Sequence, residues 1–197
     1  MGAKWMLYTP RVSRPSLELW LVRHGETVHN ASRLVAGWCD PPLTPRGRAE
    51  ASAVSAVLDG TRFDSVWSSD LERALETARL AWGEPRPDSR LREVNLGSLE
   101  GRSYDDVDPV FTRMFIEFRD FDVPGGETFG RFRARVHGFL EELPPGRHLL
   151  FVHGGVIRAV TQDLGLDRFV DNGSVVGVDW SARRLLFVRA GGGGIDG

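Results

Sequence analysis

Apolar and polar residues alternate in blocks along the chain, and the spacing within each block predicts its secondary structure. Short apolar runs, typical of buried parallel strands, occupy residues 17–23 and 148–152, and a further strand is predicted over 63–68. Apolar residues at helical spacing predict helices over 44–58, 71–82, 110–118, 128–143 and 156–164. Two later runs, 174–180 and 185–189, have the pattern of a closing hairpin. Strands that alternate with helices predict an α/β fold, a three-layer sandwich whose mostly parallel sheet is flanked by helices.

The same pattern predicts how the chain is divided. Residues 1–16 contain two prolines and no period, so we expect an N-terminal extension before a single domain at 17–190. The pattern becomes less regular within 102–126, which predicts a small helical cap inserted into that domain. The consecutive glycines at 191–194 predict a flexible Gly-rich tail over 191–197.

The composition of the chain limits which binding partners and which cellular location we expect. The chain has 25 Lys and Arg against 27 Asp and Glu, so no excess of positive charge predicts binding to nucleic acid or to a membrane. Cys39 is the only cysteine, which excludes an intramolecular disulfide and a metal site built from several cysteines. No apolar run reaches the length of a signal peptide core or of a membrane span, so we expect a cytoplasmic protein.

Arginine accounts for all but one of the basic residues, since Lys4 is the only lysine. Compositional bias explains most of this number, and we expect arginines such as Arg131, Arg133 and Arg135 to lie on solvated faces. A few others can bind planar anions, because a guanidinium forks across two oxygens where an ammonium does not. Only the position of each arginine in the fold can show whether it binds an anion or lies on a solvated face.

The chemistry-bearing residues follow three of the predicted strands. Arg23 and His24 end the first, the Ser68–Asp70 segment ends the second and leads to Arg73, and His153 ends the third. Ligands of such folds bind beyond the carboxyl ends of the strands. We therefore expect two histidines and two arginines to converge there.

These residues lie in a known pattern. The segment LVRHGET at 21–27 resembles the RHG signature of the histidine phosphatase superfamily, which has the phosphoglycerate mutase-like fold. Further segments that resemble the family pattern follow in the same order, at Asn30, 37–47, 68–78, 91–101, 124–127 and 153–155. The resemblance covers about residues 17–190, and the chain looks most like the α-ribazole phosphatase and broad-specificity phosphatase branch.

The resemblance implies a reaction through a covalent phosphohistidine on His24. It implies Glu93 as the proton donor of the leaving alcohol, although Glu100 and Glu127 lie in matched segments too and stay alternatives. His153 is implied as a further catalytic residue, which donates to the phosphoryl oxygens. No cofactor and no metal is implied.

Phosphate binding is implied for Arg23, Arg73 and Asn30. Two of these residues also have an ordinary structural interpretation. Arg73 is close in sequence to Glu72 and Glu76 and could form a surface ion pair, and Asn30 could cap a turn.

The function that we expect is metal-independent hydrolysis of a small phosphorylated metabolite, for which α-ribazole 5′-phosphate is one candidate. The alternatives are a phosphoglycerate mutase and a non-catalytic phosphate-binding module. A mutase must exclude water while its substrate reorients, and the predicted cap is short for that task. The partner is then a small phosphorylated substrate, with no nucleic acid and no membrane, and the sequence allows a homodimer without predicting one.

The cap contains an apolar and aromatic stripe with two interpretations. It either packs into the core or favours a leaving group with an apolar surface. The stripe consists of Tyr104, Phe111, Met114, Phe115, Phe118 and Phe121. Other hydrolase signatures fail on spacing: six residues separate Cys39 from Arg46 where a cysteine phosphatase needs five, and no HExxH or GxxxxGK[ST] segment occurs.

Overall fold

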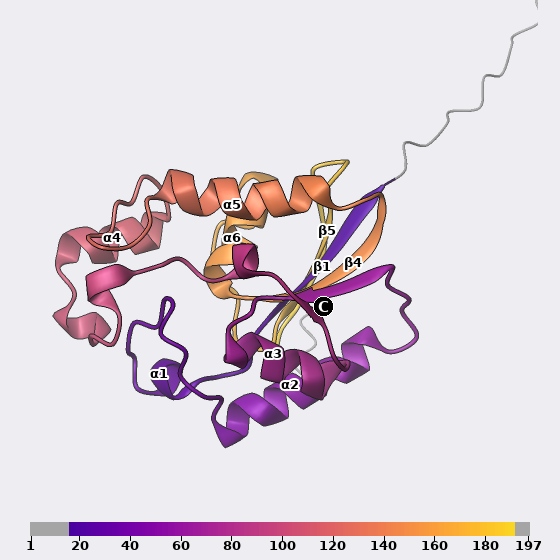
Figure 1. Ribbon diagram of the computed structural model, residues 1–197, viewed down its shortest axis with the longest axis horizontal. Coiled ribbons are helices and arrows are strands. Elements are labelled where there is room, and N and C mark those ends of the chain that lie inside the picture. Colours follow the sequence, from indigo (N-terminus) through magenta and orange to yellow (C-terminus); the bar gives the residue numbers. More distant parts are fainter. Residues whose placement is uncertain (1–15, 192–197) are drawn as a thin grey trace, which may run out of the picture.

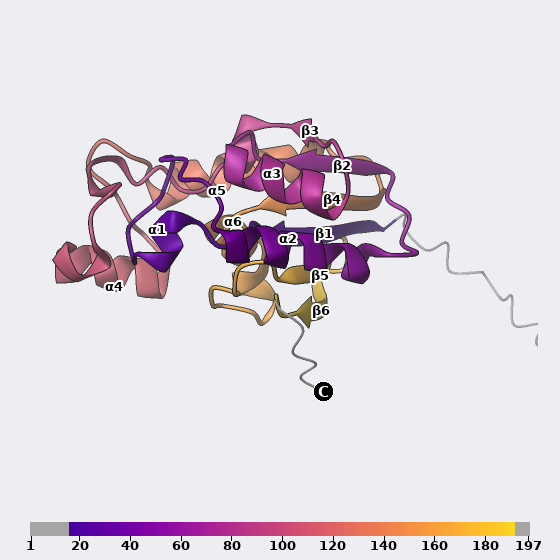
Figure 2. The same cartoon turned by 90° about the horizontal axis from the view of Figure 1, so that it is seen from below.

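A six-stranded sheet forms the centre of the computed structural model, which describes residues 16–191. The strands lie in the order β3-β2-β4-β1-β5-β6, as Figure 2 shows. Their bounds are β1 Leu17–Arg23, β2 Ser65–Ser68, β3 Arg86–Pro87, β4 Gly146–Val152, β5 Val175–Asp179 and β6 Arg184–Arg189. The α/β sandwich predicted from the sequence is confirmed.

β1 lies between β4 and β5 in this sheet. It runs parallel to β4, with Leu21 opposite Leu150, and antiparallel to β5, with Leu21 opposite Val176. β4 also pairs in parallel with β2, and β2 pairs in parallel with β3. The carboxyl ends of β1, β2 and β4 therefore meet at one edge of the sheet.

Helices cover both faces. α2 (Pro45–Leu58) and α3 (Glu72–Ala81) lie on one side, and α5 (Phe129–Glu142) and α6 (Gly154–Thr161) lie on the other (Figure 1). The short α1 (Val28–Ala31) and α4 (Pro109–Glu117) lie beyond the ends of the strands in both ribbon views. The 3-10 turns are η1 Ser89–Leu91, η2 Gly97–Leu99, η3 Tyr104–Asp106 and η4 Gln162–Leu164.

The helix starts follow from capping side chains. Thr44 accepts a hydrogen bond from the Gly47 amide at 2.9 Å, and Pro45 takes the first helical position, where its missing N–H costs nothing. Thr128 caps α5 in the same way through the Arg131 amide. The helices predicted over 44–58 and 128–143 therefore begin at these two caps.

The core is divided by the sheet because successive strand side chains point to opposite faces. Leu19 and Leu21 of β1 join the larger apolar cluster with α5 and α6. Val22 joins the smaller cluster, which contains Val54 of α2 and Ala78 of α3. The central strands are buried on both faces, which explains the continuous apolar runs in the sequence.

Several boundaries differ from the predicted ones. The second strand begins at Ser65 instead of 63, and α6 begins at Gly154 instead of 156 because His153 takes the N-cap position. α1 and β3 were not predicted, since elements of four and two residues are too short to show a period. The predicted extension at 1–16 and tail at 191–197 fall, apart from Ser16 and Gly191, outside the described residues.

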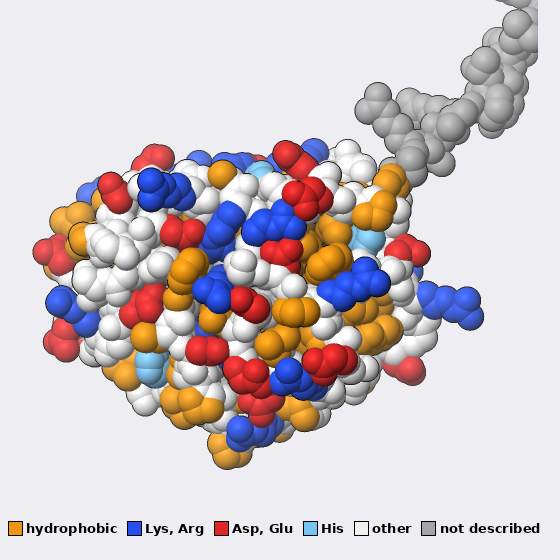
Figure 3. Space-filling view, in the orientation of Figure 1, with side chains coloured by type: hydrophobic (Ala, Val, Ile, Leu, Met, Phe, Trp, Pro, Cys, Tyr) orange, Lys and Arg blue, Asp and Glu red, His pale blue; other side chains and the backbone are white. Residues whose placement is uncertain are grey.

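The region predicted as a cap, 102–126, contains η3 and α4. α4 ends where Phe118 takes a left-handed conformation, with φ of 49°. Among residues 16–191, no helix is both long enough and apolar enough to span a membrane. On the face seen in Figure 3, basic and acidic side chains are interspersed, in keeping with the small net charge of −2.

Candidate active site

Three strand ends bring the predicted histidines and arginines together, as expected. Arg23 closes β1 and is followed by His24, while His153 follows β4 and opens α6. The imidazole rings of His24 and His153 lie with their centroids 5.1 Å apart. Arg73 enters from the first turn of α3, just after β2. Residues more than a hundred positions apart thus share one edge of the sheet.

The tautomer of His24 follows from its hydrogen bond. Its Nδ1 lies 2.8 Å from the carbonyl oxygen of Gly25, which can only accept, so Nδ1 carries the proton. In the neutral ring, Nε2 then holds a lone pair. Burial lowers the pKa of His24 well below its ordinary value, and the positive charges of Arg73 and Arg23 lower it further. The ring is therefore neutral at pH 7 and can act as a nucleophile at Nε2.

Gly25 is required by the close approach of two backbone segments. A Cβ at this position would lie 2.1 Å from the carbonyl oxygen of Gly47, at the start of α2. Such a contact is far inside van der Waals distance. The carbonyl that fixes the His24 tautomer thus belongs to a residue that can only be glycine.

Arg73 is a buried guanidinium and not part of a surface ion pair. Its side chain is 1% exposed, and it donates to the carbonyl oxygens of Gly37 and Cys39 at 2.7 and 2.8 Å and to Asp40 at 3.2 Å. The neighbouring acidic residues Glu72 and Glu76 pair with other arginines. The ion-pair interpretation open at the sequence level is wrong.

Two arginine nitrogens at the site have no partner among the described residues. These are Nε of Arg23 and Nε of Arg73, both buried on side chains that line a cavity. Arg23 also donates through Nη1 to the carbonyl oxygen of Val170. Burial lowers the pKa of both guanidinium groups. Buried donors without partners are rare in folded proteins, and an anion of the size of phosphate would satisfy them.

His153 lies behind His24 and not on the cavity wall. Its ring packs edge-on against His24, and neither ring nitrogen has a hydrogen-bond partner among residues 16–191. Burial lowers the pKa of His153 well below its ordinary value, with a further contribution from the charge of Arg73. The ring is neutral and keeps one N–H to donate. Its role toward the phosphoryl oxygens stays a prediction.

Asn30 caps a turn, as one interpretation of the sequence expected, and it also faces the cavity. Its Oδ1 accepts from the backbone and hydroxyl of Thr27, each at 3.0 Å, and this capping box starts α1. Asn172 donates to the same oxygen at 3.3 Å. These bonds fix the orientation of the amide, and the side chain lines the cavity. Its NH₂ group is thereby presented as a donor, and its contact with phosphate stays a prediction.

Three glutamates were candidates for the proton donor, and only Glu93 lines the cavity. One carboxylate oxygen of Glu93 accepts from the Val94 amide at 3.0 Å, and the other accepts from the Gly155 amide at 3.0 Å. Gly155 lies in the first turn of α6, two residues after His153. The carboxylate is thus held at the cavity that His24 also lines.

The other two glutamates have structural roles. Glu100 accepts from the backbone amides of Trp38, Cys39 and Leu96, at 2.7, 2.8 and 3.0 Å. Glu127 forms a two-point ion pair with Arg135. Neither carboxylate is free to reach a substrate.

The cavity next to His24 has a volume of about 520 Å³, within the range of small-molecule sites. The charged lining residues beyond the two arginines are Glu93, Arg158, Asp167 and Arg168. The apolar part of the wall includes Phe115 and Ile116 of α4 together with Phe169. The aromatic stripe is divided between the cavity wall and the core, and its preference for an apolar leaving group stays a prediction. Tyr104, Phe115 and Phe118 line the cavity, whereas Phe121 is buried in the core and Phe111 and Met114 pack against it.

Several residues that support the site were not predicted from the sequence. Asp40 holds Arg73, and Arg135, predicted to be solvated, is 16% exposed and bonded to backbone carbonyls next to Glu93. Arg135 lies three residues after Phe132 and four before Phe139, which is the buried stripe of α5. That spacing was the available signal. Arg133, in contrast, does pair with Asp163 at the surface.

Comparisons with known proteins agree with this geometry. The sequence profile of the histidine phosphatase superfamily (branch 1) matches residues 19–191. A protein named "Probable phosphoglycerate mutase GpmB" from Salmonella choleraesuis (strain SC-B67) is 36% identical over 182 residues, which cover 86% of this chain and 80% of that protein.

Two solved structures have the same fold. TTHB049 from Thermus thermophilus has a TM-score of 0.82 and 45% identity, covering 88% of this chain and 99% of that one. A protein provisionally named alpha-ribazole-5′-P phosphatase from Escherichia coli (K-12 MG1655) has a TM-score of 0.75 and 28% identity, covering 92% and 100%. The family profile spans the strand ends that carry both histidines and both arginines, and the chain belongs to the histidine phosphatase superfamily, branch 1.

Proposed function

We propose that the protein is a metal-independent phosphomonoesterase that hydrolyses a small phosphorylated metabolite through a phosphohistidine on His24. The observation that carries this proposal is the state of His24. Its ring is neutral, its Nδ1 proton is bound to Gly25, and its remaining lone pair lies at a cavity with unpartnered nitrogens of Arg23 and Arg73. Two guanidinium groups balance the two charges of a phosphate monoester.

The first half-reaction transfers the phosphoryl group to the enzyme. Nε2 of His24 attacks phosphorus, the bond between phosphorus and the alcohol oxygen breaks, and Glu93 gives its proton to that oxygen. The phosphorylated imidazole carries positive charge. The Gly25 carbonyl stabilises it, because Nδ1 still donates its proton there.

The second half-reaction regenerates the enzyme. Water attacks phosphorus and loses a proton to the Glu93 carboxylate, while the bond between phosphorus and Nε2 breaks. Inorganic phosphate leaves, His24 is neutral again, and Glu93 is again protonated. Glu93 is the acid of the first step and the base of the second, so its carboxylate must keep a fixed place near the histidine. The Val94 and Gly155 amides hold it in place through their hydrogen bonds to its two oxygens.

The apolar walls support a leaving alcohol with an apolar surface. Phe115, Ile116 and Phe169 surround the space beyond the phosphate position, and Ile116 is 69% exposed at its rim. Covering such side chains with an apolar group is favourable by about 25 cal/mol per Å². α-Ribazole 5′-phosphate, which the name of the E. coli relative suggests, is one candidate of this kind.

Phosphoglycerate mutase activity is the second candidate, and the names of relatives favour it. The same phosphohistidine would return its phosphoryl group to a hydroxyl of the bound product instead of to water. A phosphoglycerate carries a carboxylate, which needs a cation away from the phosphate. Arg158 on the cavity wall is already bound by Asp167 and by two carbonyl oxygens of α4. Arg168 also lines the cavity and could take this role, so substrate comparison has to separate the two candidates.

The decisive experiment separates these activities. We expect release of p-nitrophenol from p-nitrophenyl phosphate in the presence of EDTA, with inhibition by vanadate. Rapid quenching with a ³²P-labelled ester should trap an acid-labile, alkali-stable adduct that is absent in His24→Asn. A requirement for added divalent metal, or a label on another residue, would contradict the mechanism.

Substrate comparison decides the finer question. Phosphate release from aryl and nucleoside monophosphates should exceed that from glycerol phosphates. With 2,3-bisphosphoglycerate present, isomerisation of 3-phosphoglycerate that outpaces phosphate release would show that the mutase assignment is correct instead.

A further inference from the structure

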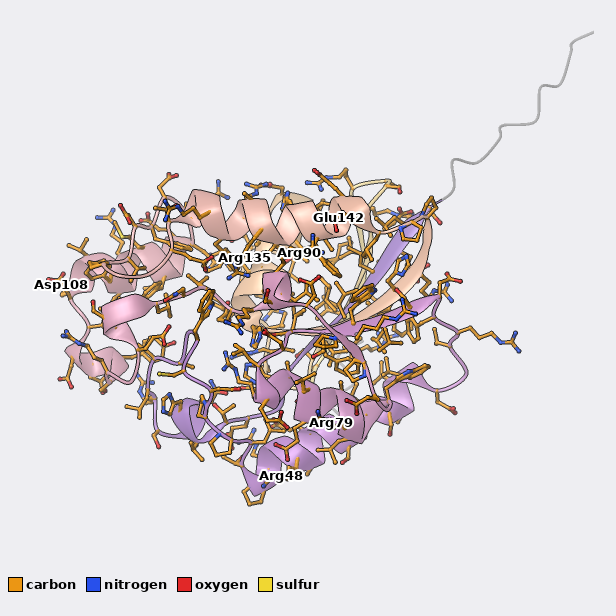
Figure 4. The ribbon with its side chains drawn as sticks, in the orientation of Figure 1. Arg48, Arg79, Arg90, Asp108, Arg135 and Glu142 are labelled. Carbon is orange, nitrogen blue, oxygen red and sulfur yellow. The ribbon has the colours of Figure 1, made fainter. Side chains whose placement is uncertain are left out.

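Arg135 is a nearly buried arginine whose donors are directed at one short backbone segment. Its Nη1 donates to the carbonyl oxygens of Arg90 and Arg92 at 2.8 and 2.7 Å, and its Nη2 donates to the carbonyl oxygen of Glu93 at 2.6 Å. Glu127 holds the other edge of the guanidinium through bonds of 2.7 and 2.8 Å. In Figure 4 the labelled Arg135 lies beneath α5, on the side of the helix that faces the molecule.

The carbonyl oxygen of Glu93 accepts a second hydrogen bond, from a residue that precedes it in the sequence. Nε1 of Trp38 donates to it at 2.7 Å. The Trp38 ring also lies 5.9 Å from the guanidinium carbon of Arg135, and Phe132 lies 4.9 Å from it. Two donors on a single carbonyl fix the rotation of the peptide group between Glu93 and Val94.

That peptide group also sets the direction of the Glu93 carboxylate. A peptide is planar and its N–H points away from its C=O, so holding the oxygen also aims the Val94 N–H. This N–H donates to Oε1 of Glu93 at 3.0 Å. The second carboxylate oxygen is held by Gly155 on α6. Arg135 therefore acts on the carboxylate through the backbone and touches neither the cavity nor the carboxylate itself.

Glu127 makes this arrangement compatible with burial. It cancels the charge of Arg135 and also accepts from the Asn95 amide at 2.8 Å, so the pair holds residues 90 to 95 from one side. A lysine could not replace the guanidinium, because one ammonium cannot reach three carbonyls and a carboxylate at once.

We propose that Arg135, held by Glu127, is a positioning residue that fixes the proton donor Glu93 at the distance and angle needed for proton transfer. This inference rests on the proposed phosphatase function and adds a residue to it. Its consequence is specific: loss of Arg135 impairs the step that protonates the leaving group and leaves phosphate binding and attack by His24 in place.

The test compares two esters that differ in their need for a proton donor. p-Nitrophenolate leaves without protonation, whereas an alkoxide does not. We expect Arg135→Met to lower kcat for an alkyl phosphate about 100-fold, the effect of a misplacement near 1 Å, and kcat for p-nitrophenyl phosphate only a few-fold. The vanadate Kd should stay within a factor of about two, and Arg135→Lys should recover only part of the loss.

Two further variants make the result unambiguous. Arg131→Met removes an exposed arginine of the same helix and should change neither rate. In a Glu93→Gln background, Arg135→Met should cause no additional loss with the alkyl ester, because the group that it positions no longer donates.

Three outcomes would overturn the inference. The first is an equal loss of kcat with both esters, and the second is a rise in the vanadate Kd as large as the loss of kcat. The third is additive losses of kcat in the double variant. If Arg135→Met does not fold, Glu127→Gln should show the same selectivity for the alkyl ester with a smaller loss. A wild-type protein that hydrolyses neither ester would reject the proposed function itself, whereas an active wild type with the outcomes above rejects only the role of Arg135.

Discussion

Acidification should destabilise the ligand-free protein because His24 and His153 are buried in their neutral forms. Burial and the charges of Arg73 and Arg23 lower both pKa values well below those of an unfolded chain. Between pH 6.5 and these lower values, the unfolded state binds protons that the folded state does not. The free energy of unfolding therefore falls as the pH decreases below about 6.5, and the two histidines contribute no pH dependence well above it.

The size of the effect follows from proton linkage. A group protonated only in the unfolded state lowers stability by about 1.4 kcal/mol per pH unit once the pH is below its unfolded pKa. For the two histidines together, the change from pH 7.0 to 5.5 amounts to about 2–3 kcal/mol. Carboxylates such as Asp88 and Asp167, whose pKa values are lowered by partner arginines, lose their contribution only at more acidic pH.

Urea unfolding in phosphate-free buffers at constant ionic strength measures this quantity, with the six tryptophans as the fluorescent probe. The midpoint of the wild type should fall by about 1–2 M between pH 7.0 and 5.5. His153→Gln should lose about half of that pH dependence, whatever its absolute stability. His137, whose pKa is also lowered by burial, contributes equally to both proteins.

The reasoning would be refuted by a His153→Gln variant that keeps the full wild-type pH dependence. A wild type equally stable at both pH values would refute it as well. Either result would mean that the ring takes up a proton in the folded state without cost.

Two further predictions concern the residues around the phosphate position. Gly155→Ala would place a Cβ 2.1 Å from Oε1 of Glu93, so the carboxylate must move, and kcat for alkyl phosphates should fall about 100-fold in steady-state assays. Gly138→Ala is the control, since nothing lies within 4 Å of its new Cβ, and an equal loss there would contradict the explanation. Arg73→Lys should leave the Gly37 carbonyl without its donor, or leave Asp40 with backbone donors alone, and lower stability by about 1–3 kcal/mol in urea. The vanadate Kd should rise at least 10-fold, and an unchanged Kd would exclude Arg73 from the phosphate site.

The place of the site could be predicted from the sequence because it depends on local signals. A buried strand shows as an apolar run, and its carboxyl end is the first polar residue after it. Arg23 was thereby expected at the end of β1, His24 directly after it and His153 after β4, where the structure has them. The parallel direction of the strands then brought them to one edge without any knowledge of contacts.

The surroundings of each side chain could not be predicted in this way. Arg73 is held by Asp40 from 33 positions away, and nothing in its own helix distinguishes it from a surface arginine. Glu93, Glu100 and Glu127 look equivalent in sequence. Only the fold shows that Glu93 lines the cavity, whereas Glu100 is held by backbone amides and Glu127 by Arg135. Arg135 was misplaced because its charge was given more weight than its position on the apolar stripe.

The position of β1 in the sheet has a consequence for synthesis on the ribosome. β1 emerges first, yet its partners β4 and β5 begin at Gly146 and Val175. Because synthesis proceeds at about 5–20 residues per second, both edges of β1 stay unpaired for on the order of ten seconds. The apolar residues of β1 are exposed to other nascent chains during that time. We therefore expect chains truncated before residue 146 to aggregate, and His24 to reach its place in the fold only when most of the protein has been made.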